Sequence, residues 1–404
     1  MQKTTTLSNG LTVITDHSDH YVSTILTYWV KAGGNNEKNY PYGIAHFLEH
    51  MMFKGTKNRT KDDIKEEVDM IGGKWNASTW GEKTRYYINL PYDQWKTGVD
   101  ILTDMVYQST FPLDELEQEK GVVLEEIKRS TDDPSGYTYR QLIQHFMKER
   151  PERQSVLGTA KSVSSITQED LKAFCDEFYQ PSNMVFVAAG NIDHDALVAA
   201  LETITPKTSK AVDSSVPAFE PFALNGETIS SEKETAQAHV RWGMFAPTGH
   251  DKDAYVMEVI TNLLSNRFFK LIREEIGAYA VGESYGGGND TGYIVGYAGI
   301  DYSNLEKVKQ VIIDEHEKLK TEELAEKELI RTKNSITGSY FIEQDYKETH
   351  DYNLAIDHMY GLGETPLEYK EKINAVTAED IKRVAKAYFT PENLVFVQVV
   401  PKSN

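Results

Sequence analysis

The sequence is poor in cysteine and has no long apolar run. Cys175 is the only cysteine among 404 residues, so no disulfide can form within the chain. No stretch is long and apolar enough to span a membrane, and Met1-Gln-Lys-Thr-Thr-Thr6 lacks the apolar run of a secretory signal. We therefore expect Cys175 to be a small core residue, no membrane partner, and a cytoplasmic protein. A leader cleaved from a longer chain is the alternative.

Positive charge is also scarce. The chain has 43 Lys and Arg residues against 62 Asp and Glu residues, a formal net charge of −19. Nucleic acids select basic surfaces, so no nucleic-acid partner is expected. The excess of acid is compatible with basic or neutral partners, including cationic peptides, and equally with solubility alone.

One apolar stretch, Gly43 to Lys54, contains three ionisable residues. The stretch has the periodicity of a helix, and that helix would be apolar on nearly every side, which is typical of a buried helix. His46 and His50 are one turn apart with Glu49 beside them, and burying such groups without partners is costly. A zinc ion bound by the two imidazoles would remove that cost. Glu49 would then lie near the ion, placed to take a proton from a bound water.

The pattern His-x-x-Glu-His reverses the commoner His-Glu-x-x-His zinc helix and is typical of inverzincin metallopeptidases. The alternative is a chance match, in which two core histidines are satisfied by backbone carbonyls. A catalytic zinc usually has three protein ligands and one open position for water. Two histidines are therefore not enough, and a third ligand must come from elsewhere in the chain.

The best source of a third ligand is the helix predicted over 114–129. Glu119 and Glu126 are seven residues apart, so they share a face of this helix with the two valines between them. Glu125 falls on a side that looks solvated. Periodicity thus selects Glu119 and Glu126 as inward-facing, and the alternative for each is an ordinary surface carboxylate.

Short-range patterns divide the rest of the chain into strands and helices. Asn9-Gly10 between apolar alternations predicts a hairpin, and a charged helix runs from Thr60 to Gly72-Gly73. Two strands are predicted within 74–90, and single strands at 23–30, 184–189, 239–245, 279–285 and 292–298. Helices are predicted to fill 92–147 and 305–360.

The chain also repeats itself at a separation of 210 positions. We therefore predict two homologous α/β halves, at 1–204 and 226–404, of which only the first carries His-x-x-Glu-His. The three prolines and many small residues of 205–225 predict a linker. The repeated segments are Thr167-Gln-Glu-Asp-Leu with Thr377-Ala-Glu-Asp-Ile, and Pro181-Ser-Asn-Met-Val-Phe-Val with Pro391-Glu-Asn-Leu-Val-Phe-Val.

Together these motifs resemble the pitrilysin-type (M16) zinc peptidases, which include insulin-degrading enzyme and the mitochondrial processing peptidases. The resemblance is nearest to bacterial processing-peptidase-like members of similar length, and it covers essentially the whole chain. A zinc motif followed about 75 residues later by a glutamate is highly specific. Besides the zinc helix, the resemblance rests on Leu7-Ser-Asn-Gly-Leu-Thr-Val13, Gly72-Gly-Lys-Trp-Asn-Ala-Ser-Thr79, Gly121-Val-Val-Leu-Glu-Glu-Ile127 and both Asn-x-Val-Phe-Val strands.

The resemblance implies a fold and a set of site residues. The fold is α+β, of the LuxS/metallohydrolase type, with two similar halves that each pack helices on a mixed, mainly antiparallel sheet. His46, His50 and Glu126 are implied to bind one zinc ion per chain. Glu49 is implied to be the general base, and Glu119 to support the site by orienting a ligand.

Two further segments match parts of the family that meet the substrate. Asn76 and Ala77 match an edge strand to which the substrate backbone adds as a β-strand, with a turn or strand-end asparagine as the alternative for Asn76. Arg273-Glu-Glu-Ile-Gly-Ala-Tyr279 resembles a segment whose arginine and tyrosine reach the substrate at the zinc site. Its spacing here is one residue shorter than the usual pattern, and an ordinary tyrosine at a helix end is the alternative for Tyr279.

The sequence therefore predicts a zinc metalloendopeptidase that hydrolyses unfolded or short peptides inside an enclosed chamber. The resemblance also implies a homodimer, because long-chain relatives close their chamber with four such domains and this chain has two. The alternative is a non-catalytic peptide-binding or partner subunit of a peptidase complex, against which the complete set of zinc residues argues. A small-molecule zinc hydrolase has no support beyond the metal site.

Overall fold

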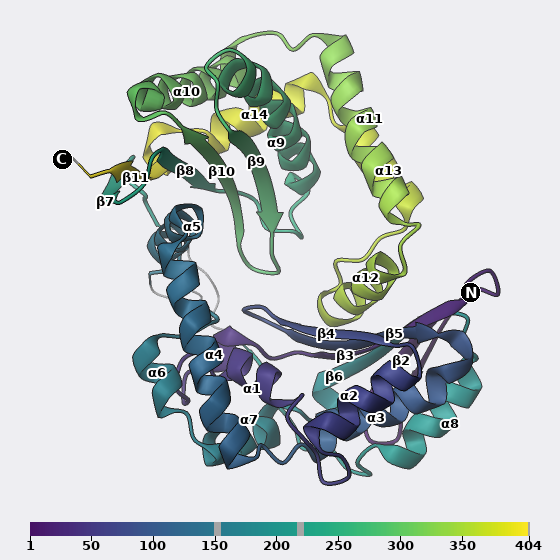
Figure 1. Cartoon of the computed structure of the whole chain (residues 1–404). Helices are drawn as coiled ribbons and strands as arrows, with labels where there is room; N and C mark the ends of the chain where they lie inside the picture. Colours follow the sequence, from purple (N-terminus) through teal and green to yellow (C-terminus); the bar gives the residue numbers. More distant parts are fainter. Residues whose placement is uncertain (149–154, 216–221, 403–404) are drawn as a thin grey trace. The chain divides into compact units, whose positions relative to one another are not determined.

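The structure is a computed structural model that describes residues 1–148, 155–215 and 222–402. The chain forms two compact units, each with its own sheet and its own helices (Figure 1). So far as they are described, unit 1 contains Met1–Arg129, Gln154–Pro217 and Gln344–Gly363, and unit 2 contains Ser130–Arg153, Ala218–Glu343 and Glu364–Asn404.

Unit 1 is built on a six-stranded sheet in the order β1-β2-β6-β3-β5-β4. Strands β2 and β6 run parallel, and the other neighbouring pairs run antiparallel. The expected turn at Asn9-Gly10 joins β1 to β2, with Gly10 at a φ of 92° that favours glycine. The strands are β1 (Gln2–Thr6), β2 (Thr12–His17), β3 (Ser23–Val30), β4 (Lys74–Thr79), β5 (Thr84–Pro91) and β6 (Met184–Gly190).

Unit 2 has a five-stranded sheet in the order β7-β11-β8-β10-β9, with β7 and β11 parallel and the other pairs antiparallel. If β1 is set aside, the two sheets have the same strand order. In chain order, the strands of each sheet lie side by side as first, fifth, second, fourth and third. The expected α+β class, with two similar halves on mixed and mainly antiparallel sheets, is confirmed. The strands are β7 (Thr228–Lys233), β8 (Ala238–Phe245), β9 (Ala280–Gly287), β10 (Gly292–Ile300) and β11 (Val395–Pro401).

The repeated sequence motif begins equivalent helices in the two units. The Thr167 hydroxyl accepts a hydrogen bond from the Asp170 N–H at the start of α7 (Gln168–Phe178). The Thr377 hydroxyl does the same with the Asp380 N–H at the start of α14 (Ala378–Tyr388). Each threonine and aspartate form a reciprocal capping box that satisfies free N–H groups of the first turn, and each helix leads into the fifth strand of its half.

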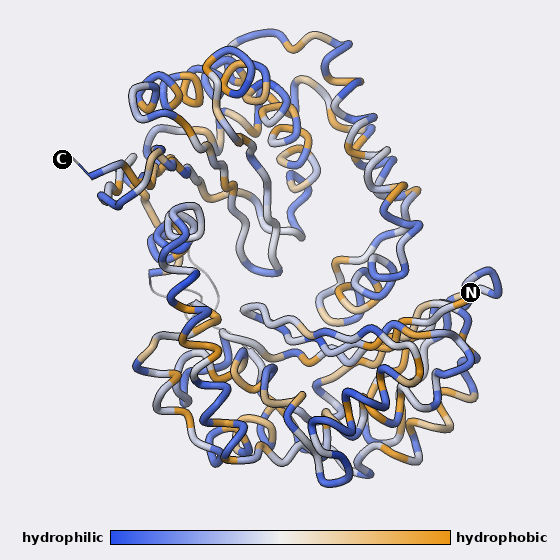
Figure 2. Tube along the Cα trace, viewed as in Figure 1, coloured by the Kyte–Doolittle hydropathy of each residue, from blue (hydrophilic) through white to orange (hydrophobic). Residues whose placement is uncertain are grey.

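Helices fill the stretches between strands. In Figure 2 the long hydrophilic run on α2 contrasts with the hydrophobic strand β6. Among the described residues, no helix combines the length and apolarity that a bilayer crossing requires. The remaining helices are α1 (Ile44–Met51), α2 (Lys61–Met70), α3 (Trp95–Gln108), α4 (Leu113–Asp132), α5 (Pro134–Phe146), α6 (Ala160–Ser165), α8 (His194–Ile204), α9 (Ala254–Phe268), α10 (Leu305–Thr321), α11 (Glu326–Glu343), α12 (Lys347–Tyr360) and α13 (Pro366–Ala375).

Each unit contains one helix from the other half of the sequence. Helix α5 packs on β8 and β11 in unit 2, and α12 packs on β3 and β6 in unit 1. Strands β8 and β11 hold the same places in their sheet as β3 and β6, so the exchange is reciprocal. The division predicted at 1–204, 205–225 and 226–404 follows the sequence repeat and stays a prediction, and residues 216–221 of its linker lie outside the described residues.

Helix α1 lies inside the core of unit 1. Ile44, Phe47, Leu48 and Met51 are fully buried, and the helix packs against β4 and α7. As expected, Cys175 of α7 is a free thiol packed against this core. The apolar sides of α1 are therefore used for packing, which leaves its histidines on the remaining side.

Candidate metal centre

Helix α1 begins at a glycine, and a glutamate that lies six residues earlier in the chain caps it. Gly43 has a φ of 90°, and a Cβ there would lie 2.7 Å from the Leu157 carbonyl oxygen, so the position favours glycine. The Glu37 carboxylate accepts hydrogen bonds from the N–H groups of Gly43 (2.8 Å) and Ala45 (3.0 Å). Helix N-termini leave such groups unsatisfied, and Glu37, 1% exposed, supplies their partners from outside the helix.

Two imidazoles and one carboxylate converge beside α1. The Nε2 atoms of His46 and His50 are 3.3 Å apart, and the Glu126 Oε2 atom lies 3.7 Å from the first and 3.8 Å from the second. Ligands held at zinc bond lengths in a tetrahedron are about 3.4 Å apart. The chain thus brings His46, His50 and Glu126 together, as the sequence predicted, at separations that suit a zinc ion.

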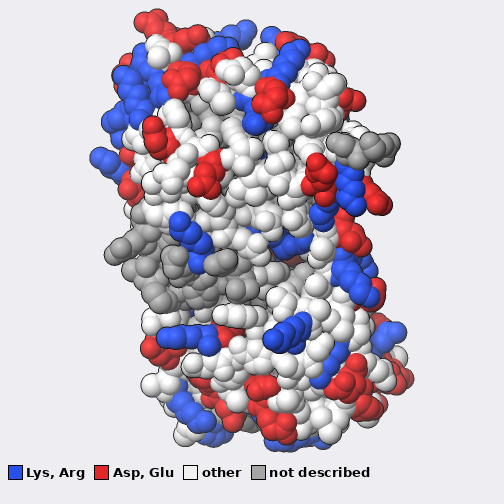
Figure 3. Space-filling view, turned by 90° about the vertical axis from the view of Figure 1, so that its left-hand side faces the viewer, with Lys and Arg blue, Asp and Glu red and all other residues white. Residues whose placement is uncertain are grey.

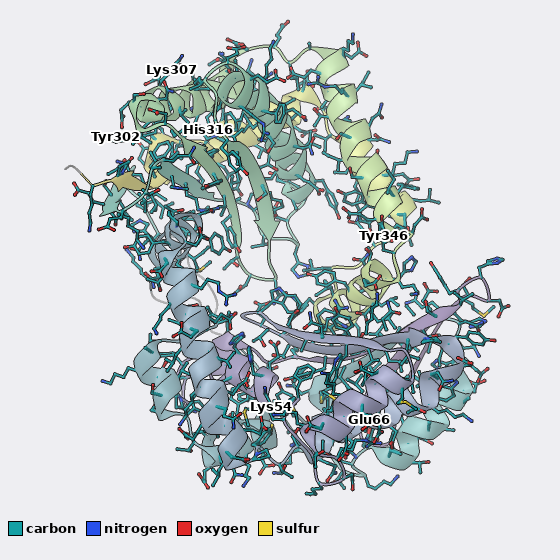
Figure 4. The ribbon with its side chains drawn as sticks, viewed as in Figure 1. Lys54, Glu66, Tyr302, Lys307, His316 and Tyr346 are labelled. Carbon is teal, nitrogen blue, oxygen red and sulfur yellow. The ribbon has the colours of Figure 1, made fainter. Side chains whose placement is uncertain are left out.

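Glu119 holds one of the imidazoles. The His50 Nδ1–H group donates to Glu119 Oε1 (2.8 Å), and Lys54 Nζ forms an ion pair with Glu119 Oε2 (2.5 Å). Lys54, labelled in Figure 4, follows the C-terminal end of α1. Because Nδ1 of His50 carries the donated proton, its Nε2 lone pair is left facing the cluster. Glu119 is 5% exposed and contacts His50. Its role in orienting this ligand stays a prediction.

The buried setting shifts the pKa values of this cluster. Burial, together with the neighbouring His50, lowers the pKa of His46 to about 3, so the ring is neutral. Burial alone lowers the pKa of His50, but the hydrogen bond to Glu119 and the nearby carboxylates raise it above its ordinary value. Burial raises the pKa of Glu119, and its bonds to His50 and Lys54 outweigh that and lower it. A neutral His46 offers the lone pair that a metal requires.

Glu49 lies next to the cluster and is held separately from it. The Thr79 hydroxyl of β4 donates a short hydrogen bond to Glu49 Oε2. Burial raises the pKa of Glu49, although Thr79 and His50 partly oppose this shift. A raised carboxyl pKa suits a group that both accepts and releases protons near neutral pH, which is consistent with the role predicted for Glu49.

Glu126 and Glu125 point in different directions, as helical periodicity predicted. Glu126, 40% exposed at its side chain, faces the histidines, whereas Glu125 pairs with Lys128 at the surface. Of the two valines between Glu119 and Glu126, Val123 is fully buried but Val122 is 52% exposed. The inward face of α4 is therefore narrower than the sequence suggested.

Asn76 and Ala77 lie on β4, at the edge of the sheet. In the described sheet β4 pairs with β5 on one side, which leaves its other side open. Asn76 is exposed and Ala77 is buried. The edge-strand position expected for these two residues is thus confirmed, and the addition of a substrate strand stays a prediction. The same strand carries Thr79, so substrate at this edge would lie next to the partner of Glu49.

Arg273 and Tyr279 belong to unit 2. Arg273 lies in a π-helical turn (Phe269–Glu274) that continues α9, and its Nη1 group donates to the Tyr279 carbonyl oxygen (2.7 Å). Tyr279 follows this turn and precedes β9, with its side chain 77% exposed. Tyr279 is therefore not a residue of the helix end, which was the alternative reading. The catalytic role of both residues stays a prediction.

Sequence reasoning missed three groups that shape this site. Glu37 and Thr79 reach α1 from other elements, and Lys54 pairs with Glu119 instead of solvent. The sequence around Glu37 and Thr79 carries no spacing signal. The Glu49 partner of Thr79 is 30 residues away, and the contact of Glu37 depends on the turn of the chain before α1. Lys54, four residues after His50, follows the helix period, which was the available signal.

The fold and the ligand set together define a candidate metal centre on a two-unit α+β scaffold. Residues 12–160 match the family described as insulinase (peptidase family M16), and residues 165–336 match the M16 peptidase inactive domain. The chain is 32% identical to an uncharacterized zinc protease of Rickettsia felis, over 95% of this chain and 94% of the relative. It is 30% identical to another of Bacillus subtilis, over 100% and 99% of the two chains. The chain belongs to peptidase family M16.

Solved structures of low sequence identity share the fold. A protease from Helicobacter pylori superimposes with a TM-score of 0.89 at 22% identity, over 99% of both chains. A Pseudomonas fluorescens structure titled as a peptidase M16 inactive domain gives a TM-score of 0.90 at 18% identity, over 100% of this chain and 98% of the other. Residues 165–336 match a family described as an inactive domain, and this description agrees with the absence of His-x-x-Glu-His from the second half of the sequence.

Proposed function

We propose that the protein is a zinc metalloendopeptidase whose site is built on α1 and α4. The observation that carries this proposal is the convergence of His46, His50 and Glu126 beside Glu49. A zinc ion held by His46, His50 and Glu126 would supply a Lewis acid that activates water and polarises a carbonyl group. Both properties are those that peptide hydrolysis requires.

The chain's own residues supply positioning and proton transfer. Glu119 fixes the ring of His50, and the cap from Glu37 fixes the first turn of α1. Glu49, held by Thr79, accepts a proton from the attacking water and returns it to the leaving amine. The names of the zinc-protease relatives support a zinc-dependent protease activity, and the residue roles are part of the proposal.

The substrates proposed are unfolded or short peptides, hydrolysed inside an enclosed chamber. The open side of β4 supports this class, because a strand added to an edge is recognised through its main chain and tolerates many sequences. In a stable folded domain most extended segments are already paired or packed, so few can add to this edge. A peptide cleaved when free but resistant within a stable folded domain would fit the proposal, and equal cleavage of both would refute it. The cytoplasmic location stays a prediction from sequence.

The test of the proposal is metal-dependent hydrolysis. Purified protein should hold about one zinc ion per chain and cleave quenched fluorescent peptides. Removing the metal with a chelator should abolish cleavage, and adding zinc should restore it. Full activity in metal-free protein would refute the zinc mechanism. Stoichiometric zinc without any cleavage across a random peptide library would favour the alternative, a non-catalytic partner subunit.

A further inference from the structure

Unit 2 has an open trough on one face of its sheet. The cavity measures about 590 Å³ and lies over β9 and β10, beside β8. Helix α5 covers the β8 and β11 side of this face, where Leu142 and Phe146 pack over Gly243 (Figure 1). The β9 side is left open because its residues there are small: a Cβ at Gly282 would meet no atom within 4 Å.

Arg241 of β8 lies at the wall of this trough. Its guanidinium carbon is 5.2 Å from the centre of the Tyr139 ring and 4.9 Å from the centre of the Tyr297 ring. Its Nη2 group donates to the Ser135 hydroxyl (3.2 Å). Tyr297 is fixed in turn by His239, whose Nδ1 atom is 2.8 Å from the phenol oxygen. Aromatic rings and a serine therefore hold the guanidinium in one orientation, as at sites that bind planar anions.

Arg241 forms no ion pair within 4 Å among the described residues, where the Asp133 carboxylate acts on it only from farther away. The buried Nε atom of Arg241 forms no hydrogen bond there. Two other arginines of low exposure are paired: Arg85 with Asp351, and Arg267 with Glu315 and Glu328. A half-buried charge without a counterion in contact is costly, and acidic residues outnumber basic ones in this chain. Burial lowers the pKa of Arg241, although the nearby tyrosines and Asp133 partly oppose this shift. A ligand can bring the counterion in direct contact that the described residues do not supply.

We propose that this trough binds the carboxylate of a peptide, with Arg241 as its counterion. A guanidinium presents a fork of donors that matches a carboxylate. The floor beside the edge strand β9 gives room for extended main chain, with Gly282 and Ser284 facing Tyr297 and Val295 across the strands. The proposal rests on the proposed function for the identity of the ligand, a peptide, while the site itself lies wholly within unit 2.

Binding is tested on the Glu49→Gln protein, which should bind peptides without cleaving them. Fluorescence anisotropy compares one labelled peptide with a free C-terminal carboxylate, its C-terminal amide, and the amide with an internal glutamate. The carboxylate peptide should bind at least about tenfold more tightly than the amide. The added Arg241→Gln change should remove that preference, and Arg241→Lys should retain part of it.

Arg140 of α5 provides the matched control. It is also partly buried and donates to the Ser130 carbonyl oxygen, but it does not line the trough. Arg140→Gln should leave the carboxylate preference unchanged, and thermal unfolding should show that each variant is folded. If the amide peptide with an internal glutamate binds as tightly as the carboxylate peptide, a side-chain carboxylate can occupy the trough. If it binds no better than the plain amide, the trough selects the C-terminal carboxylate. An equal preference for the carboxylate in the Arg241→Gln protein would refute the proposal, whether or not the protein cleaves peptides.

Discussion

Glu49 and Glu126 differ in what holds them, and their roles should separate accordingly. Glu49 is partly buried and accepts a hydrogen bond from Thr79, whereas Glu126 Oε2 lies within 3.8 Å of the Nε2 atoms of both histidines. We expect Glu49→Gln to retain zinc and to lose about 10²-fold or more in turnover, because a general base is lost. We expect Glu126→Gln to weaken zinc retention. Metal analysis and peptide turnover on the same preparations measure both.

Glu125 provides the neighbouring control. It pairs with Lys128 at the surface, so Glu125→Gln should change neither zinc content nor turnover. If Glu49→Gln lost the metal while Glu126→Gln kept it, the two roles would be the reverse of those proposed.

Glu37 gives the folded chain a pH-dependent stability. Burial raises its pKa to about 8 in spite of the hydrogen bonds from Ala45 and Gly43, against about 4.5 in the unfolded chain. The folded state therefore holds this proton more tightly, and stability falls as the pH rises between these two values. One proton contributes at most about 1.4 kcal/mol per pH unit.

Glu37→Gln should remove this component of the pH dependence. Thermal unfolding in excess chelator from pH 4.5 to pH 8 measures it without the contribution of metal binding. Glu66→Gln, a change at an exposed position of α2, should leave the wild-type slope intact. Parallel pH profiles for wild type and Glu37→Gln would show that Glu37 does not titrate in this range.

At the level of single residues, the sequence was sufficient wherever the partners lie on one helix. His46 and His50 are one turn apart, and the spacing of Glu119 and Glu126 on α4 follows from the helical period. Glu37 was not predictable in this way, because its partners depend on how the chain turns before α1. Arg241 carried no signal either, since only the fold decides which acids come within ion-pair distance of it.

At the level of elements, Asp351 connects α12 to its sheet. It is fully buried, with one oxygen 3.3 Å from Trp29 Nε1 on β3 and the other 3.3 Å from Arg85 Nη2 on β5. Asp351→Ala would leave the arginine buried without a counterion, which costs about 3–5 kcal/mol. Denaturant unfolding of the full chain should show that loss.

Glu348 on the same helix is the control for this prediction. It is exposed and accepts a hydrogen bond from Asn89 (3.0 Å). Glu348→Ala should cost about 1 kcal/mol or less. Similar losses for the two substitutions would mean that the buried ion pair contributes nothing beyond an ordinary surface contact.

Most strands and helices were predictable from periodicity, but their arrangement was not. The strand predicted at 23–30 is β3 itself, and the predicted stretch 305–360 is divided among α10, α11 and α12. The exchange of α5 and α12 carried no local signal. Apolar residues on α12, such as Leu354 and Ala355, indicate that a face is buried but not which sheet buries it.

At the level of the whole molecule, the net charge of −19 does not make the face drawn in Figure 3 uniformly negative. Figure 3 shows Lys and Arg interspersed with Asp and Glu over the face in view. Interspersed charges favour solubility and weaken long-range attraction of one kind of partner. The simpler of the two explanations offered for the acidic composition, solubility, is consistent with this face.

The homodimer predicted from the family resemblance is testable by complementation. If Tyr279 of one subunit serves the zinc site of the other, an isologous dimer is required. Glu49→Gln and Tyr279→Phe chains should each be nearly inactive alone. Co-expressed, their mixed dimers should recover activity, because one of the two sites then holds both wild-type residues. Peptide turnover of mixed dimers isolated with two affinity tags measures the recovery.

Failure of complementation has a defined meaning. If mixed dimers form and stay inactive, either each chain builds its site alone or Tyr279 is not the catalytic tyrosine. A Tyr302→Phe chain, altered at another exposed tyrosine of unit 2, should remain active by itself and serves as the control.

The reciprocal exchange of α5 and α12 sets the order in which the protein can be finished during synthesis. The ribosome makes β3 and β6 long before it reaches Lys347, the first residue of α12. The sheet face that carries Trp29 and Val187 therefore stays exposed until α12 has been made. Unit 2 meets the opposite case, because α5 has already been made when its first strand appears. Completion of both units thus falls to the last part of translation, and until then the nascent first half is a client for any chaperone that binds exposed apolar strands.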